Sequence, residues 1–231
     1  MTKTLLVSTI AFTVLTSVTP EQVCEKDICT GDINNNESRI YPELLGLDQE
    51  DPALIKAIKE RVLIRPPPKK AKLKLKSGMS WEKLKGQFGQ VELIVNEGER
   101  MGIDPNKKGF FVEAGASDGE EYSNTLYLEQ KLKWTGLLVE ANPNFVQDLV
   151  KKNRRSWILP HCLSIKNTSS VEEFDNISFW GGIVNKQGFP GSSMPGDIDR
   201  KGRRYPPFMN RRTLQVSFQG LVNCLIRYIH F

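Results

Sequence analysis

One segment in the middle of the chain constrains its fold more than any other. An apolar run suited to a buried strand, Phe110–Val112, leads into a glycine-containing loop, Glu113–Gly119. A helical stretch over Ser123–Leu132 is followed by a second apolar run, Leu137–Val139, which ends in Glu140. Strand, loop, helix and strand in this order predict a βαβ unit with two parallel strands and a right-handed crossover.

The sequence after Glu140 extends this unit. Asn142 is a suitable N-cap, and Pro143 a suitable first residue, for a further helix. The apolar face of that helix is expected to comprise Phe145, Leu149 and Val150. A third strand is expected at Trp157–Leu159, so the sequence predicts an α/β fold with a parallel sheet.

The loop and Glu140 together predict a nucleotide-type ligand site. Gly115 and Gly119 allow the backbone to turn sharply and to approach a ligand closely. The helix that follows is expected to present free N–H groups at the same place. Glu140 stands at the carboxyl end of the second strand, 21 residues after Gly119, where a carboxylate can accept hydrogen bonds from both hydroxyls of a ribose.

Two acids in the loop indicate which nucleotide it suits. The loop does not have the pattern G-x-G-x-x-G; it begins at Glu113 and contains Asp118. Both carboxylates would repel a pyrophosphate, whereas the ammonium of a methionine moiety would gain about 4 kcal/mol at about 4 Å with an effective dielectric constant of about 20. The loop therefore favours S-adenosylmethionine over NAD. A doubly wound domain without a ligand remains the alternative.

The block FFVEAGASDGEEYSNTLYLEQKLKWTGLLVEANP resembles the FkbM family of methyltransferase domains, and within it the animal members related to the insect protein Star. The likeness covers Gly109–Gly182 and includes His161 and Cys162 after the third strand. It implies a Rossmann-like parallel sheet of the S-adenosylmethionine methyltransferase type. It also implies a cofactor site formed by Glu113, Gly115, Ala116, Asp118, Gly119, Asn124 and Glu140.

The chain also departs from that family. Family domains continue with a strand that ends in an acidic S-L-D-x-E-G-like segment, and no such segment follows Gly182. We therefore expect the domain over residues 80–231 to be truncated, with a parallel sheet that is incomplete at the C-terminus. Loss of the cofactor stays open for the same reason, and no catalytic residue is assigned. His161 is the nearest candidate base, with a structural role as its alternative.

The first 19 residues predict entry into the secretory pathway. Lys3 precedes the apolar run Leu5–Val18, which is the layout of a secretory signal. The 14 residues of this run span only about 21 Å of a hydrocarbon core of about 30 Å, so a cleaved signal peptide is favoured over a short signal anchor. A buried strand or helix remains the alternative. The glycosylation triplets at Asn36, Asn167 and Asn176 agree with secretory entry.

The four cysteines fit an oxidising compartment without defining their pairing. Cys24 and Cys29 are close enough to close a small disulfide loop, with two free thiols as the alternative. A bridge between Cys162 and Cys224 stays open as well. No histidine lies near the first pair, so no metal site is expected.

Residues 20–50 are polar and predict a stalk, and residues 51–79 predict a helix followed by a linker rich in proline and lysine. Within the second segment, a helix is expected over Asp51–Ile64 with Asp51 as its N-cap, and the prolines at 66–68 end it. The run Lys69–Lys76 is expected to be a solvated linker. Contact with acidic lipid or with an acidic partner surface remains the alternative.

A further helix is expected over Ser80–Gly98, with a buried face formed by Trp81, Leu84, Phe88, Val91 and Ile94. The net charge of +5 is unevenly spread, because Ile55–Lys76 carries +8 and Arg200–Arg212, an expected surface loop, carries +6. The remaining residues are therefore acidic. This distribution argues against a uniformly basic nucleic-acid binder, and no nucleic-acid partner is expected.

The resemblance also implies a role. Star-like proteins are membrane-linked factors that assist the export of growth-factor precursors between the endoplasmic reticulum and the Golgi. We therefore expect a secretory-pathway protein, in the endoplasmic reticulum, Golgi, endosome or plasma membrane or secreted, that traffics membrane cargo. Its expected partner is a membrane or secretory cargo protein, and its oligomeric state stays open. An S-adenosylmethionine-dependent O-methyltransferase is the alternative, and a defective product without a function of its own is the third.

Overall fold

The structure is a computed structural model of the 231-residue chain. It describes residues 4–7, 12–17, 41–76, 86, 89–102, 104, 107, 109–164, 166–175, 182–183 and 210–217. Several expectations fall outside the described residues: most of the stalk, the triplets at Asn36 and Asn176, and the cysteines Cys24, Cys29 and Cys224.

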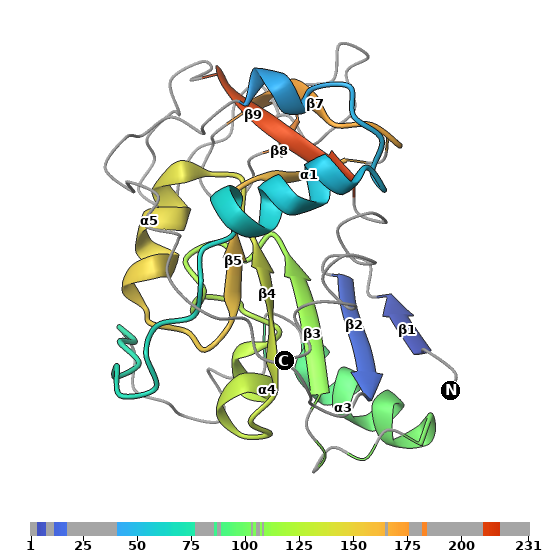
Figure 1. Ribbon diagram of the computed structural model, residues 1–231. Coiled ribbons are helices and arrows are strands. Elements are labelled where there is room, and N and C mark those ends of the chain that lie inside the picture. The colour runs from blue at the N-terminus through green and yellow to red at the C-terminus, as the bar shows by residue number, and fades with distance from the viewer. Residues whose placement is uncertain are drawn as a thin grey trace, which may run out of the picture.

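The main sheet has the strand order β1-β2-β3-β4-β5 (Figure 1). Its centre is parallel: β3 (Gly109–Ala114) pairs with β4 (Thr135–Val139), and β4 pairs with β5 (Trp157–Leu159). The α/β class and the three parallel strands are therefore confirmed. The apolar N-terminal run forms an antiparallel pair, β1 (Thr4–Val7) and β2 (Phe12–Ser17), and β2 joins the outer edge of β3 in antiparallel orientation.

The helix expected over Asp51–Ile64 forms but ends earlier. Asp51 caps it as predicted, because its carboxylate accepts a hydrogen bond from the backbone N–H of Ala53 at 2.7 Å. The short 3-10 turn η1 (Pro42–Leu44) precedes it, and α1 (Pro52–Ala57) continues into the wider turn η2 (Ile58–Val62). Leu63 is extended, and Ile64 exchanges two backbone hydrogen bonds with Ile158 of β5, which draws the chain out of the helix.

The prediction of one helix over Ser80–Gly98 is wrong. The helix in this region is α3 (Gln90–Arg100), and Gly86 and Gly89 have φ angles of +75° and +77°. A left-handed backbone at these two positions interrupts any helix that includes them. The later part of the predicted face is confirmed, since Val91 and Ile94 are buried, whereas Trp81, Leu84 and Phe88 lie outside the described residues.

The two crossover helices differ from their predicted extents. The first, α4 (Leu126–Gln130), is much shorter than Ser123–Leu132, because Glu113 and the hydroxyl of Ser123 bind the backbone N–H groups that would begin the helix. The second, α5 (Pro143–Lys151), is capped by Asn142 as expected. Its buried positions are Val146 and Leu149, while Phe145 and Val150 are only half-buried.

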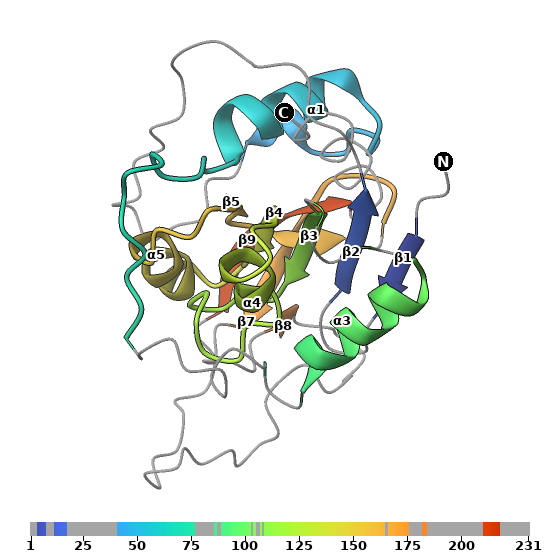
Figure 2. The same cartoon turned by 90° about the horizontal axis from the view of Figure 1, so that it is seen from below.

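The sheet is covered on both faces (Figure 2). On one face, Leu54, Ile58 and Leu63 pack against alternate strand residues, among them Phe110 and Leu137. On the other face lie the residues of α3, α4 and α5 together with the opposite alternation of the strands: Ile94, Leu128, Leu149, Phe111, Leu138 and Ile158. Burial on both faces explains why the strands read as continuous apolar runs.

A second sheet was not predicted. Its order is β6-β9-β7-β8, with β6 (Cys162–Ser164), β7 (Ser170–Asp175), β8 (Gly182–Ile183) and β9 (Asn210–Ser217). β9 is parallel to β6 and antiparallel to β7. Part of the expected loop Arg200–Arg212 therefore belongs to a strand. Figure 1 shows this sheet beyond the carboxyl ends of β3, β4 and β5.

Candidate functional site

The residues expected to bind a cofactor gather at the carboxyl ends of β3 and β4. Glu113 is on β3, the glycine loop leads away from its end, and Glu140 follows β4. In open α/β sheets, ligands bind outside the carboxyl ends of parallel strands. The fold thus brings the predicted residues to the edge of the sheet where such a ligand would lie.

Glu113 is buried and bound by the segment that follows the glycine loop. Its carboxylate accepts hydrogen bonds from the backbone N–H of Asn124 at 2.7 Å, the hydroxyl of Ser123 at 3.0 Å and the hydroxyl of Thr125 at 2.6 Å. Three neutral donors satisfy the acid and hold residues 123–125 against the strand end. Glu113 therefore shapes the site from within the protein.

Arg154, 1% exposed, ties the same segment to α4. Its guanidinium donates to the Glu129 carboxylate at 3.0 Å and to the Gly119 carbonyl at 2.6 Å. It also donates to the hydroxyls of Ser123 and Thr125, both at 3.1 Å. One buried cation thus fixes the end of the glycine loop and both hydroxyl partners of the acid on β3.

The backbone of the glycine loop is bound to β4. The N–H groups of Gly115 and Ala116 both donate to the carbonyl of Val139, at 2.9 and 3.0 Å. Gly115 and Gly119 have φ angles of +76° and +75°, which favour glycine. A Cβ on Gly119 would lie 2.2 Å from Cδ1 of Leu149, so this position also requires the absence of a side chain.

Asp118 is neutralised by the chain itself. Its carboxylate accepts the backbone N–H groups of Glu120 and Glu121, both at 2.9 Å, and lies 3.5 Å from the ammonium of Lys152 and 3.4 Å from that of Lys76. Burial acts to raise the pKa of Asp118, but these N–H groups and cations outweigh it and hold the pKa below its usual value. Its charge is therefore already compensated before any ligand ammonium approaches.

Lys152 is itself buried, at 3% exposure, between two acids. Besides Asp118, its ammonium contacts the carboxylate of Glu120, with which it forms a short ion pair. The Glu120 carboxylate also accepts the backbone N–H of Lys76 at 2.8 Å. The turn after the glycine loop is thereby joined to α5 and to the lysine-rich run.

Glu140 has the least compensation of the acids at the site. It is 7% exposed and accepts the backbone N–H groups of Ser117 and Asn142, each at 2.7 Å. Burial raises the pKa of Glu140 above its ordinary value, while these N–H groups oppose the rise and the nearby charge of Glu113 adds to it. Each carboxylate oxygen accepts one of these hydrogen bonds and retains acceptor capacity for a further donor.

Two buried polar atoms beside these acids have no hydrogen-bond partner among the described residues: Oδ1 of Asn124 and Oγ of Ser117. Asn124 is 6% exposed, and Oδ1 lies 2.4 Å from where a Cβ on Gly86 would stand. Buried polar atoms are rarely left unpaired, and those that are often face a water or a ligand. Both atoms border the carboxyl ends of β3 and β4.

His161 and Cys162 lie at the end of β5. His161 is fully buried, its Nδ1 has no partner in the described part of the chain, and burial lowers its pKa to about 4. Cys162 carries a free thiol whose pKa burial and the charge of Glu140 raise to about 11. The bridge from Cys162 to Cys224 is therefore not formed. A neutral, enclosed imidazole is poorly placed to exchange protons with a substrate.

Sequence reasoning identified the acids but missed their partners. Arg154, Lys152 and Glu120 carry charge into the site, and Ser117 carries one of the unpaired atoms. Arg154 and Lys152 come from the end of α5 and the turn behind it, more than 30 residues from the glycine loop. Only the resemblance of the Ser123-Asn124-Thr125 segment to the family pointed toward this side of the site.

No protein-family model, curated protein or solved structure matches the chain. The fold thus stands as an α/β domain with a three-stranded parallel sheet, compatible with a Rossmann-like arrangement. Within the described ranges, no helix is both long and apolar enough to cross a membrane. Nor do the described residues hold three His, Cys, Asp or Glu side chains grouped to bind a metal ion.

Proposed function

We propose that this chain is a Star-like secretory-pathway protein whose methyltransferase-type domain serves the trafficking of membrane cargo rather than methyl transfer. One observation carries the non-catalytic part of the proposal. The two loop acids that would attract a cofactor ammonium, Glu113 and Asp118, are bound by donors and cations of the chain itself. The state of His161 supports the same conclusion, because a buried imidazole with a pKa of about 4 is a weak base.

The secretory part of the proposal rests on the sequence. The apolar run Leu5–Val18 and the glycosylation triplets favour entry into the endoplasmic reticulum. Of the triplets, Asn167 lies among the described residues and is exposed, as glycosylation requires. The family resemblance connects such a protein to the export of growth-factor precursors.

The test is an export assay in cultured insect cells. A membrane-anchored growth-factor precursor is expressed with or without the full chain, and its arrival at the cell surface is measured. We expect the chain to increase surface arrival, and we expect Glu140→Ala to retain that effect. An unchanged surface signal with a folded, expressed chain contradicts the trafficking role, and loss of the effect in Glu140→Ala contradicts the non-catalytic mechanism.

A second candidate, an S-adenosylmethionine-dependent O-methyltransferase, is favoured by a different observation. Asn124 Oδ1 and Ser117 Oγ are unpaired, and Glu140 retains acceptor capacity, all at one edge of the sheet. This set fits an adenosyl group: Glu140 would accept the ribose hydroxyls and Asn124 would receive a further donor. When bound, S-adenosylmethionine would supply an electrophilic methyl group, and the chain would orient it.

Isothermal titration of the full chain with S-adenosylmethionine separates the two candidates. For the methyltransferase, we expect micromolar binding that Glu140→Ala abolishes and Glu121→Ala leaves unchanged. Glu121 is the matched control, because it is an exposed acid on the same loop and only its backbone N–H contacts Asp118. Absence of binding to a folded sample rejects the methyltransferase candidate and leaves the scaffold.

A further inference from the structure

The lysine-rich run is fixed to the domain through its backbone. We call Pro67–Lys76 the strap. The Arg155 guanidinium, which extends from the turn after α5, clamps the first half of the strap. It donates to the carbonyl oxygens of Pro67, Pro68, Lys69 and Ala71, at 3.4, 2.7, 2.5 and 2.7 Å. A run expected to be a free linker is therefore held in one place.

The second half of the strap is attached at every other residue. Its anchored residues are Lys72, Lys74 and Lys76. Their bonds run from Asn153 Nδ2 to Lys72 O at 2.9 Å, from Lys74 N to Lys152 O at 2.8 Å, and from Lys76 N to Glu120 Oε2 at 2.8 Å. Figure 2 shows this segment running along the outside of the domain past α5.

Leu73 and Leu75, between the anchored residues, make no hydrogen bond within the described part of the chain. Exposure alternates in the same way, because the two leucines are half-buried and the lysines on either side are exposed. In an extended backbone, alternate residues direct their N–H and C=O groups to opposite edges. One edge of the strap is thus bound to the domain, and the other offers unpaired backbone groups.

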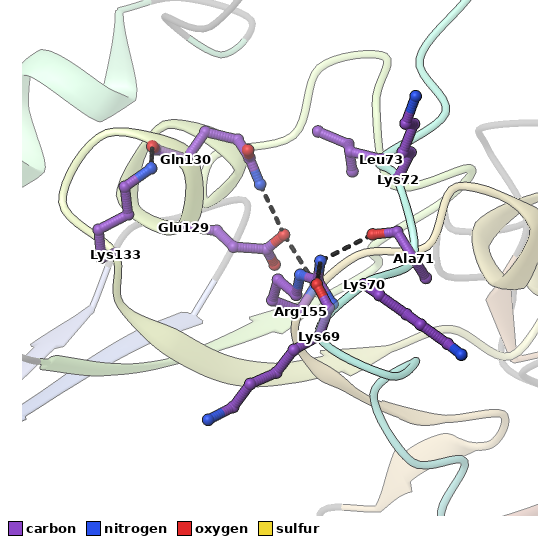
Figure 3. A pocket seen from close by; sticks show the side chains of 9 residues that line it. All are labelled: Lys69, Lys70, Ala71, Lys72, Leu73, Glu129, Gln130, Lys133 and Arg155. Atoms are coloured by element: carbon purple, nitrogen blue, oxygen red, sulfur yellow. Dashed lines mark hydrogen bonds between the residues drawn. The ribbon is translucent and has the colours of Figure 1, made fainter.

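The lysines give this edge a uniform charge. Lys69, Lys70, Lys72 and Lys74 are exposed and have no ion-pair partner among the described residues, and the strap contains no acid. Extended backbone would place the alternate lysines about 6.6 Å apart on one face. In Figure 3 the ammonium groups of Lys69, Lys70 and Lys72 point in different directions, so they do not converge on one small anion.

A hollow of about 510 Å³ adjoins the strap. It lies between Leu73 and the end of α4, where Gln130 and Lys133 line it (Figure 3). It offers space beside Leu73 for an incoming side chain, with a further lysine at its rim.

We propose that the free edge of the strap binds an extended acidic peptide, which adds as a β-strand with a carboxylate at every second residue. Backbone hydrogen bonds to Leu73 and Leu75 would set the register, and the carboxylates would lie opposite Lys72 and Lys74. A second copy of the strap is excluded as the partner, because its lysines would face those of the first. This inference does not depend on the cofactor or the trafficking role.

The test uses the full chain and two fluorescein-labelled peptides of equal composition. One is Glu-Val-Glu-Val-Glu-Val-Glu, and the other is Val-Val-Val-Glu-Glu-Glu-Glu. We expect the alternating peptide to bind at least about tenfold more tightly by fluorescence anisotropy, because only its carboxylates match the strap. Equal affinity for the two peptides, or no binding of either, overturns the proposal.

Two variants separate the contributions of charge and backbone. The double variant Lys72→Glu/Lys74→Glu is expected to weaken binding of the alternating peptide at least about tenfold. Its matched control, Lys56→Glu/Lys107→Glu, makes the same change in net charge at exposed residues away from the strap and should bind like the unaltered chain. Equal losses in both double variants would reduce the effect to net charge and overturn the proposal.

The variant Leu73→Pro removes one backbone donor of the free edge and leaves every lysine in place. We expect it to lose binding of the alternating peptide while its thermal melting stays close to that of the unaltered chain. Leu75→Pro serves where the first variant fails to fold. Retained peptide binding in the folded variant refutes strand addition. Binding to phosphatidylserine vesicles without peptide binding identifies the strap as a lipid contact and also overturns the proposal.

Discussion

The buried pair of Arg154 and Glu129 allows a quantitative test of how the site is held. Both side chains are fully enclosed, with 0% exposure, and Arg154 makes four hydrogen bonds in addition to none with solvent-exposed acids. Arg154→Met keeps much of the side-chain length and removes the charge and every donor. It leaves the Glu129 carboxylate buried with only neutral donors, from Ser156, Gln130 and the backbone of Arg155.

Removing one partner of a buried ion pair costs about 3–5 kcal/mol, and domains of this kind are stable by about 5–15 kcal/mol. Arg154→Met is therefore expected to lose a large fraction of the free energy of unfolding. With an m-value of about 2 kcal/mol per M, the urea midpoint should fall by about 1.5–2.5 M. Urea unfolding followed by the fluorescence of the buried Trp134 measures this shift.

Two further variants make the test specific. In Arg154→Met/Glu129→Met both charges are gone, and we expect the double variant to recover part of the loss, because no uncompensated charge remains. Arg100→Met is the control, since Arg100 is three-quarters exposed in its pair with Glu97 and should cost at most about 1 kcal/mol. A midpoint shift for Arg154→Met no larger than that of Arg100→Met, or strict additivity in the double variant, refutes the reasoning.

Three other predictions follow from single residues. Gly119→Ala should destabilise the fold by about 2 kcal/mol or more, and Gly115→Ala by only about 1, because both have positive φ but only the first meets Leu149; urea unfolding compares them. His161 has a folded pKa of about 4 against 6.5 when unfolded, so the unfolded chain takes up the proton first and stability should fall as pH drops from 6.5 to 4, by up to about 3 kcal/mol; His161→Gln should flatten that dependence in unfolding measured across pH. The Cys162 thiol, with a pKa near 11, should resist alkylation at pH 7.5 in the folded chain and react in urea, as mass spectrometry of the peptide that contains it would show.

Local signals predicted the elements that depend on neighbouring residues. Asp51 and Asn142 cap their helices as expected, and the strand at Trp157–Leu159 has the predicted bounds. The same local logic failed at α4. The expected helix start is occupied by residues 123–125, which bind Glu113 on β3 instead of forming helical bonds. No periodicity within that segment reveals a partner ten residues upstream on another element.

The second sheet and the strap lay beyond sequence reasoning for a related reason. β9 pairs with β6 and β7 across intervals of about 40 residues or more, and its pairing partners leave no signature in a single chain. The lysine run was predicted as a solvated linker from its composition. Its lysine side chains are exposed, but its backbone is clamped by Arg155, and backbone hydrogen bonding is invisible to a count of charges.

The N-terminal run shows two uses of one apolar segment in competition. As a signal peptide, Leu5–Val18 would be removed, whereas in the structure β2 pairs with β3 through Thr16–Phe110 and Ser17–Gly109. Cleavage after residue 19 would leave β3 as an edge strand, with part of one side unpaired. Mass spectrometry of the secreted chain decides between them: a mature N-terminus near residue 20 supports the signal, and an intact Met1 supports the strand.

The candidate site is best located by comparing how the buried carboxylates are compensated. Glu129 faces a full positive charge from Arg154, and Asp118 faces Lys152, so both are structurally neutralised. Glu113 has three neutral donors, which hold it in place without a cation. Glu140 has two backbone donors, a raised pKa and the charge of Glu113 nearby. A buried acid left with this little compensation is typical of a binding position, so Glu140 is the residue whose substitution should change ligand binding most while costing the fold least.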